Sequence, residues 1–370
     1  MMLFLLFVGL PIFLIFLLPK IKKSGKDNLP PGPIGLPFIG NLHQYDSLTP
    51  HLYFWELSKQ YGKIFSLKLA SAPMVVVSSP ELGKEVLKTK DLVFCSRPSL
   101  LGQQKLSYNG HDIACAPYND YWREMRKIGV LHLFSLKKVQ LFSPIRGDEV
   151  SRMINKISQQ VNTSQITNLS NLMISLTSTI ICRVAFGVRF NEEAHERKRF
   201  DYLLTEAQAM MASSFVSDFF PSYLKTVIKE AFRLYPPVPL LVPRVSMDKS
   251  TLQGYEIQPG TIIHVNSWAI ARDPEIWENP EEFIPERFLN NDIDFKGQDY
   301  ELIPFGAGRR GCPGITLGVA STELALSNLL YAFDWELPRG MKKEDIDTNV
   351  MPGITMHKKN ELFLIPKSYC

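Results

Sequence analysis

The sequence lacks the usual marks of a nucleic-acid-binding, disulfide-stabilised or zinc-dependent protein. Its 370 residues carry a formal net charge of only +4 and no basic low-complexity tract, which argues against nucleic acid as a partner. The seven histidines form no HExxH pair. No CxxC pair occurs among the five cysteines, which are Cys95, Cys115, Cys182, Cys312 and Cys370. An odd number without that spacing fits neither a disulfide framework nor a structural zinc site, so we interpret them as reduced thiols in the cytosol.

Charge is also absent from residues 1–18, which are mostly Leu, Phe and Ile. A helix of this length spans about 27 Å, close to the thickness of an endoplasmic-reticulum bilayer core. The competing interpretation, a cleaved signal peptide, requires positive charge before the apolar run and small residues at its end. Here the lysines follow the run, at Lys20, Lys22, Lys23 and Lys26. The sequence therefore predicts a single-pass signal anchor over 1–19 in the endoplasmic reticulum membrane, with the remaining chain in the cytosol.

Residues 20–38 combine these lysines with four prolines, a composition that forbids a helix and favours a stiff hinge. Residues 39–370 are expected to form one domain. Hydrophobic spacing predicts strands at 63–69 and 74–78, helices at 80–88, 120–133, 169–186, 222–234 and 313–333, and a closing hairpin at 351–366. The helix at 169–186 is expected to be mostly buried, with its hydroxyls bonded to backbone. The predicted fold class is mainly α with small antiparallel β-sheets.

The strongest chemical signal is residues 305–314, FGAGRRGCPG. A glycine-rich loop leads to Cys312, and Pro313 is a natural first residue of a helix. At a helix N-terminus, free N–H groups and the helix dipole favour a thiolate, and N–H donors to the sulfur would tune the potential of an iron. The alternative interpretation is a structural cysteine in a glycine turn. It does not explain why five residues occur together at fixed spacing, namely Phe305, Gly308, Arg310, Cys312 and Gly314.

This stretch resembles the haem-binding signature of the cytochrome P-450 family, whose cysteine ligates the haem iron. Other segments are similar to that family: Glu230-Ala-Phe-Arg233, Pro285-Glu-Arg-Phe288, Trp122-Arg-Glu-Met-Arg126, and the anchor with its Pro-Pro-Gly-Pro hinge. With the residues around Phe94–Arg97 and 351–360, the sequence most resembles the plant herb-type, membrane-anchored subfamily. The resemblance implies haem b as cofactor, with Cys312 as the axial ligand.

The resemblance also implies roles for other residues. The cofactor-binding set is Trp122, Arg126, Arg244, Phe305, Gly308, Arg310 and Gly314. Arginine suits the two haem carboxylates because its planar fork binds them bidentately. Glu230, Arg233 and Arg287 are interpreted as a structural charge cluster rather than as catalytic acids and bases.

One segment of the family pattern has no counterpart in the sequence. The resemblance implies a long distal helix with a small residue, Gly, an acidic residue and Thr, which deliver protons to oxygen. This distal helix should precede the helix that contains Glu230. In this sequence, the segments that should flank the distal helix instead adjoin each other near 221–223, where we expect an internal deletion. No catalytic residue is therefore assigned. A thiolate-haem isomerase or dehydratase, which needs no proton relay, is a further interpretation.

Two main hypotheses follow. The first is a monooxygenase that inserts one oxygen atom from O2 into an apolar small molecule of secondary metabolism, with electrons from an NADPH-dependent flavoprotein reductase. The second is a non-catalytic, truncated haem-binding form. By family position, the substrate would meet Leu100, Leu101, Val238, Leu240, Leu241 and Ile354. The reductase would meet a basic patch of Arg123, Lys127, Lys137, Lys138 and Arg309. Membrane lipid is the remaining partner, and nucleic acid is not expected.

Overall fold

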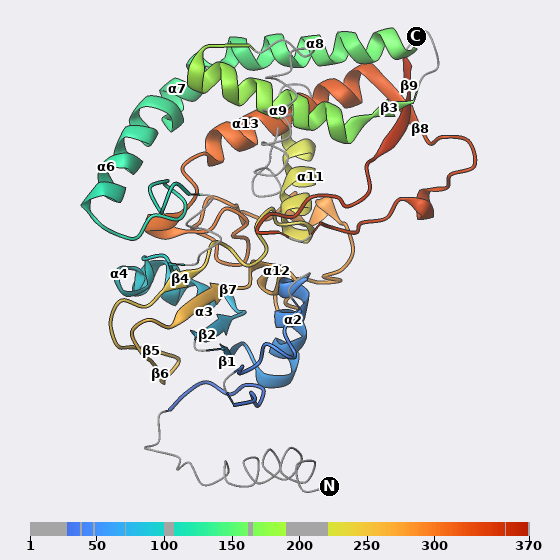
Figure 1. The fold of residues 1–370 in the computed structure, drawn as a ribbon. Helices are drawn as coiled ribbons and strands as arrows, with labels where there is room; N and C mark the ends of the chain where they lie inside the picture. The colour runs from blue at the N-terminus through green and yellow to red at the C-terminus, as the bar shows by residue number, and fades with distance from the viewer. Residues whose placement is uncertain are drawn as a thin grey trace, which may run out of the picture.

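The structure, a computed structural model, describes residues 28–37, 39–46, 49–70, 72–99, 107–161, 166–189, 221–351 and 353–368. The predicted signal anchor, the basic part of the hinge and the 100–106 loop lie outside these residues. Within them, the chain is mainly helical with small sheets, as predicted (Figure 1). The four-stranded sheet and the β5–β6 hairpin lie with α2 (Pro50–Tyr61) at one end, and the long helices α8 (Ser143–Val161) and α9 (Leu169–Phe186) lie at the other with the three-stranded sheet.

The largest sheet has the order β1-β2-β7-β4. The predicted hairpin is confirmed by β1 (Ile64–Leu69) and β2 (Ala72–Val77), which pair antiparallel. However, β2 pairs in parallel with β7 (Ile262–Val265), which in turn pairs antiparallel with β4 (Arg244–Val245). The expectation of purely antiparallel sheets is therefore wrong. A parallel pair needs a long crossover, and the chain between β2 and β7 supplies one.

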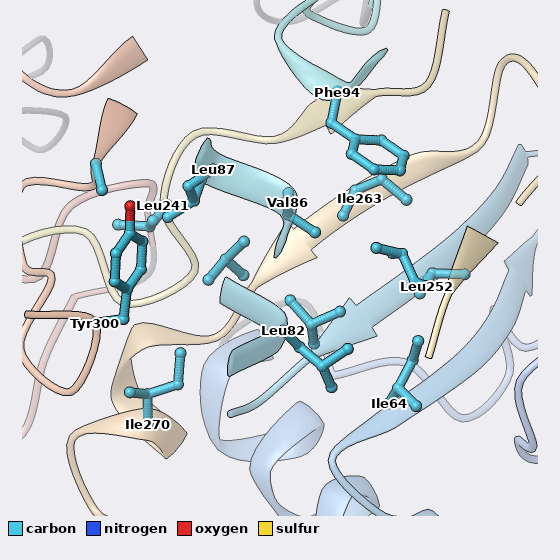
Figure 2. Packing of buried hydrophobic residues seen from close by; sticks show 14 of the residues in the cluster. Ile64, Leu82, Val86, Leu87, Phe94, Leu241, Leu252, Ile263, Ile270 and Tyr300 are labelled. Atoms are coloured by element: carbon cyan, nitrogen blue, oxygen red, sulfur yellow. The ribbon is translucent and has the colours of Figure 1, made fainter. Parts of the chain in front are cut away.

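Side chains alternate along β2, so the sheet has a hydrophobic core on each face. On one face, Val75 and Val77 pack with α3 (Pro80–Lys84) and the π-helix η2 (Glu85–Thr89). Figure 2 shows Val86 of η2 beside Ile263 of β7 and Leu87 beside Leu241, in the cluster that also holds Leu82 of α3. On the other face, Met74 and Val76 pack with α2. Each large buried side chain contributes roughly 1.5–3 kcal/mol.

Most predicted helices are present. The segment at 120–133 forms α6 (Asp120–Gly129) and the π-helix η3 (Val130–Phe134), followed by α7 (Leu136–Leu141). The helices at 222–234 and 313–333 are α11 (Pro221–Leu234) and α13 (Ile315–Ala332). The shorter elements are α4 (Asp91–Phe94), α12 (Ser267–Ile270), η4 (Pro285–Phe288), η5 (Gly308–Arg310) and η6 (Lys343–Asp345).

The helix α9 has the predicted bounds, and its Thr177 and Thr179 bond to backbone carbonyls as expected. Only 28% of this helix is buried, so the expectation of a mostly buried helix is wrong. The reason is its environment: among the described residues, α9 shares one core with α8 and α13 along one side, and the rest of the helix is half-buried or exposed. Of the described helices, it alone is long and apolar enough to cross a membrane, by length and composition.

The predicted closing hairpin is also wrong. Among the described residues, 351–366 form no hairpin with each other, and one isolated bridge joins Val350 to Lys358. The last strand β9 (Phe363–Ser368) instead pairs with β8 (Phe333–Glu336) and β3 (Thr167–Asn168). These partners are brought in by α13 and α9, so local spacing could not identify them. A separate hairpin joins β5 (Ser250–Leu252) to β6 (Tyr255–Ile257).

Candidate functional site

The loop 305–314 lies directly on the backbone of η2. Gly306 and Gly308 have φ of +67° and +66°, the left-handed region that favours glycine. A Cβ on Gly308 would lie 1.9 Å from the carbonyl oxygen of Leu87, so no side chain fits there. A Cβ on Gly314 would make only ordinary contacts, 3.9 Å from the sulfur of Cys312. Close backbone packing thus explains Gly308 but not Gly314.

Cys312 lies just before α13, which begins at Ile315 rather than at the predicted Pro313. Its N–H donates to the Phe305 carbonyl at 3.0 Å and closes the loop. The sulfur accepts from the N–H groups of Gly314 and Ile315. Desolvation by surrounding protein raises the pKa of the thiol, while these N–H groups and the Arg126 guanidinium oppose that rise. The surrounding protein thus partly desolvates the sulfur, but Cys312 as a residue is exposed, so a ligand can reach its side chain from outside the loop.

The helix α6 brings Trp122 and Arg126 to this loop. Arg126 donates to the Gly311 carbonyl at 2.7 Å and lies 5.5 Å from the centre of the Trp122 ring. Trp122 is buried, and its indole N–H donates to the Ile113 carbonyl at 2.9 Å. The structure thus brings the predicted pair together, but Ile113 already satisfies the indole N–H.

Arg310 and Arg244 are both buried. Arg310 donates to the carbonyls of Cys95 (2.7 Å) and Ala116 (2.8 Å), and its guanidinium stacks 3.9 Å from the centre of the Trp122 ring. The Nη1 of Arg310 is buried without a partner among the described residues. The nearest bond of Arg244 is a long one, 3.5 Å to the Phe94 carbonyl.

A further arginine at this place, Arg97, is missing from the predicted cofactor-binding set. It is buried and donates to the carbonyls of Ala114 (2.8 Å), Val242 (2.8 Å) and Pro243 (3.0 Å). The segment Phe94–Arg97 served only to indicate the subfamily. Its closeness to Arg244 and Arg310 depends on strand pairing near β4, which sequence spacing does not reveal.

Arg97, Arg244 and Arg310 form a cluster of buried positive charge. Burial, with mutual repulsion, lowers the pKa of Arg97, and burial lowers those of Arg244 and Arg310 to about 10. None of the three forms an ion pair with a carboxylate of the described chain. Unpaired buried cations are costly, so the cluster fits a ligand that brings carboxylates of its own. Together with an exposed sulfur that accepts N–H bonds, this donor set suits haem b.

Phe305 contributes to the site through its backbone carbonyl, which accepts the N–H bond of Cys312. Its ring points into the core beside α11, with centroids 5.0 Å from Phe232 and 5.9 Å from Phe295. The contact of this ring with a cofactor therefore has no direct support in the structure, whereas its carbonyl fixes Cys312.

The predicted charge cluster has its three members in contact. Both Glu230 and Arg233 are fully buried, and they form two bonds of 2.8 Å. Arg287 donates to the same carboxylate at 3.2 Å, as does the N–H of Ile284 at 2.8 Å. Burial opposes ionisation of Glu230, but Arg233 and Ile284 outweigh it and lower its pKa. The network joins α11 to η4, and protein groups supply all the hydrogen-bond partners that the Glu230 carboxylate has among the described residues.

The residues expected to meet substrate and reductase have different surroundings. Leu240 and Leu241 are buried in the two cores of the sheet, while Leu100 and Leu101 lie outside the described residues. In the basic patch, Arg123 pairs with Asp120, Lys127 with Glu124 and Arg309 with Asp91. Three of the five expected cations are therefore partly neutralised.

Comparisons with known proteins show the family of the chain. The family model described as Cytochrome P450 matches residues 30–226 and 221–365. The chain is 38% identical to 6,7,8-trihydroxycoumarin synthase of Pastinaca sativa over 494 aligned positions, covering 98% of each chain. It is 38% identical to 5-OH-xanthotoxin synthase of the same plant, again over 98% of each. To Cytochrome P450 71B34 of Arabidopsis thaliana it is 35% identical, over 97% of this chain and 98% of that one.

The alignments are longer than the chain itself. With the first relative, 494 aligned positions exceed the 370 residues by 124, so at least 124 positions have no residue here. The two parts of the family match overlap at residues 221–226.

Proposed function

The chain belongs to the cytochrome P450 family of plant monooxygenases, and from this premise we propose that it binds haem b through Cys312 and inserts one oxygen atom from O2 into an apolar small molecule. The observation that carries the proposal is the exposed Cys312 sulfur with its two N–H donors, close to buried arginines that lack carboxylate partners. Thiolate, N–H donors and cations are what an iron porphyrin with two carboxylates requires.

Different residues of the site would bind different parts of this cofactor. Haem b, when bound, supplies the activation of O2. Cys312 would ligate the iron, and the N–H groups of Gly314 and Ile315 would stabilise the charge on its sulfur. Arg97, Arg244 and Arg310 would bind the carboxylates, with the free Nη1 of Arg310 as one available donor. Arg126 holds the loop itself through Gly311.

For the substrate, we propose an apolar aromatic compound of plant secondary metabolism. Two relatives are named for hydroxylated products, a trihydroxycoumarin and 5-OH-xanthotoxin. Oxygen insertion into a coumarin-like ring is therefore the first reaction to assay. Pockets for such molecules are mainly apolar with few polar groups.

The proposal includes two partners and a location. Electrons would come from NADPH through a flavoprotein reductase. Residues 1–19 would tether the chain to the endoplasmic reticulum membrane, with the domain on the cytosolic side. The apolar run with four lysines after it supports this arrangement.

A second candidate is a non-catalytic, truncated haem-binding form. It is supported by the missing distal motif, the family match in two parts that meet at 221–226, and at least 124 aligned positions without a residue. The haem site could persist, since Cys312 and the Glu230 network lie outside the seam.

One experiment separates the two candidates. The chain is expressed beside a version that carries, at 221–226, the internal segment of the trihydroxycoumarin synthase, each with reductase and NADPH. We expect weak haem retention and little product from the chain, and both restored in the extended version. Equal product formation by both would favour the monooxygenase and exclude the truncated form. Absence of haem from the extended version would contradict the haem site itself.

A further inference from the structure

A sharp turn at 107–110 carries an asparagine–glycine pair that the proposed haem site does not use. Asn109 is the only asparagine in the 370 residues that is followed by glycine. Its side chain is exposed, and the preceding Tyr108 is 85% exposed. Tyr108, Asn109 and Gly110 have φ of +49°, +61° and +78°, so three consecutive residues lie in the left-handed region. The pair therefore lies in a turn outside any helix or strand.

Asparagine is a chemically labile residue, and before a glycine it can react with its own backbone. The nitrogen of Gly110 attacks Cγ of Asn109 and forms a C–N bond, while the bond from Cγ to the amide nitrogen breaks and ammonia leaves with the proton. Water then opens the cyclic imide at either of its two carbonyls. The product is an aspartate or an isoaspartate at this position, and water is the only co-reactant.

The surroundings of Asn109 leave this reaction open. Among the described residues, no group forms a hydrogen bond with its carboxamide. The N–H of Gly110 donates to the Ser107 hydroxyl at 2.9 Å, which polarises the N–H toward the loss of the proton that the attack requires. A Cβ on Gly110 would contact only the Pro117 ring, at 3.9 Å. Because Gly110 has no side chain and open space around it, nothing hinders the approach of its nitrogen to Cγ.

The loop that begins with this turn holds the side chains of the proposed haem site. Three of its backbone carbonyls accept bonds from them: Ile113 from Trp122, Ala114 from Arg97 and Ala116 from Arg310. The turn itself is closed by His111, whose N–H donates to the Ser107 carbonyl at 2.8 Å. An isoaspartate adds a methylene group to the backbone between Asn109 and Gly110. The added length shifts the residues of this closure against each other and loosens the loop that follows.

We propose that Asn109–Gly110 is a site of spontaneous deamidation, at which water converts the turn to an isoaspartate form that no longer holds the loop 111–116 in place. Each modified chain also gains a negative charge, because the carboxamide becomes a carboxylate. The modification depends on the turn alone. Its effect on haem rests on the proposed function, since the loosened loop carries the carbonyls that fix Trp122, Arg97 and Arg310.

The test incubates the full chain at neutral pH in water enriched in heavy oxygen and follows its peptides by mass spectrometry. Solvent oxygen enters the product, so conversion during the incubation is distinguished from conversion that preceded it. Asn290 is the matched control in the same chain, because it is exposed, lies in a turn and precedes Asn291 instead of a glycine. We expect Asn109 to be converted several-fold faster than Asn290, with isoaspartate among the products. Conversion of Asn109 no faster than that of Asn290 would overturn the site.

Amide hydrogen exchange of residues 110–116 measures the effect on the loop. Asn109→Gly is the unreactive variant, because it removes the carboxamide and tolerates a φ of +61°. We expect incubation to speed exchange several-fold and to lower haem retention in the parent chain, but not in Asn109→Gly. Equal changes in both chains would overturn the effect on the loop. Absence of haem from both chains before incubation would contradict the proposed function instead, while the mass and exchange results would still decide the modification.

Discussion

A single sulfur atom carries the chemistry proposed for this protein. Cys312 differs from Cys95 and Cys182, which are fully buried, because its side chain is exposed at the end of a glycine loop and accepts two N–H bonds. The features that distinguish it are local, since they come from the loop and the first turn of α13.

Cys312→Ser should therefore abolish the red-shifted carbonyl absorption of thiolate-bound ferrous haem, because serine offers no thiolate to the iron. Cys95→Ser, Cys115→Ser and Cys182→Ser serve as controls and should retain the band. Loss of the band in one of these controls, with retention in Cys312→Ser, would disprove the assignment.

Gly308 allows a prediction about the loop itself. Gly308→Ala combines a left-handed backbone, which costs an L-residue about 1–2 kcal/mol, with an overlap onto the Leu87 carbonyl. Gly254→Ala is the matched control, because Gly254 also has positive φ but has open space around it. In urea denaturation of the haem-free chain, Gly308→Ala should lose about 3 kcal/mol or more and Gly254→Ala about 1 kcal/mol. Similar losses would show that close packing on η2 is unimportant.

At the scale of elements, the Glu230 network fixes α11 against η4. Besides Glu230, Arg233 bonds to the carbonyls of Ala271, Pro280 and Glu282. Two segments distant in sequence, at Ala271 and at 280–282, thus converge on one guanidinium, at the end of the helix that follows the proposed seam. These bonds hold Ala271 and residues 280–282 against α11.

Arg233→Met should lower the free energy of unfolding by about 3–5 kcal/mol, because it leaves the Glu230 charge buried without its main partner. The control is Lys59→Met, which removes an exposed pair with Glu56 on α2 and should cost under about 1 kcal/mol. Both are measured by urea denaturation. A loss at Arg233 no larger than that at Lys59 would contradict a structural role.

The elements α6 and α7 carry the proposed reductase surface. Exchanging Lys127 and Lys138 for Glu should slow reduction of the iron several-fold at low ionic strength, because opposite charges steer the encounter. The difference should shrink as salt increases. Lys59→Glu on α2 is the control for a general change in net charge. Unchanged rates at low salt would dismiss the basic patch, whose partial neutralisation by Asp120 and Glu124 already limits it.

For the whole molecule, stability should depend on pH chiefly through two histidines, with a smaller contribution from His357, whose pKa is also lowered by burial. Burial lowers the pKa of His51 in α2 and of His264 in β7 from 6.5 to about 4. In that range the unfolded chain binds the protons that the folded chain excludes. The free energy of unfolding should thus be constant above pH 6.5 and fall from there to about pH 4, by up to about 1.4 kcal/mol per pH unit for each histidine.

Urea denaturation at a series of pH values measures this slope. His264→Gln should remove about half of it, whereas His132→Gln, at an exposed position, should leave it unchanged. Asp347 acts in a lower range, because its bonds to Asn360, Asn349 and Lys358 hold its pKa at about 2. Equal slopes in the parent and His264→Gln would show that this histidine is not the cause.

The sequence by itself determined whatever depends on neighbouring residues. The β1–β2 hairpin, the bounds of α9, and the position of Cys312 before α13 all follow from side-chain period, turn residues and a short motif. Such features involve contacts within a few positions, and physical propensities act at that range.

Only the tertiary structure decided what depends on distant contacts. Arg97 bonds to a carbonyl 145 residues away, β2 pairs in parallel with β7, and β9 pairs with β8 and β3. The burial of Leu240 and Leu241, the exposure of α9 and the bond of Ser66 in β1 to the Pro30 carbonyl likewise depend on which surfaces meet. The spacing of residues in the sequence sets the face of the helix or strand on which each one lies. Whether a side chain is buried or paired with a charge depends on the segment that packs against that face, and this segment is rarely a neighbour in the chain.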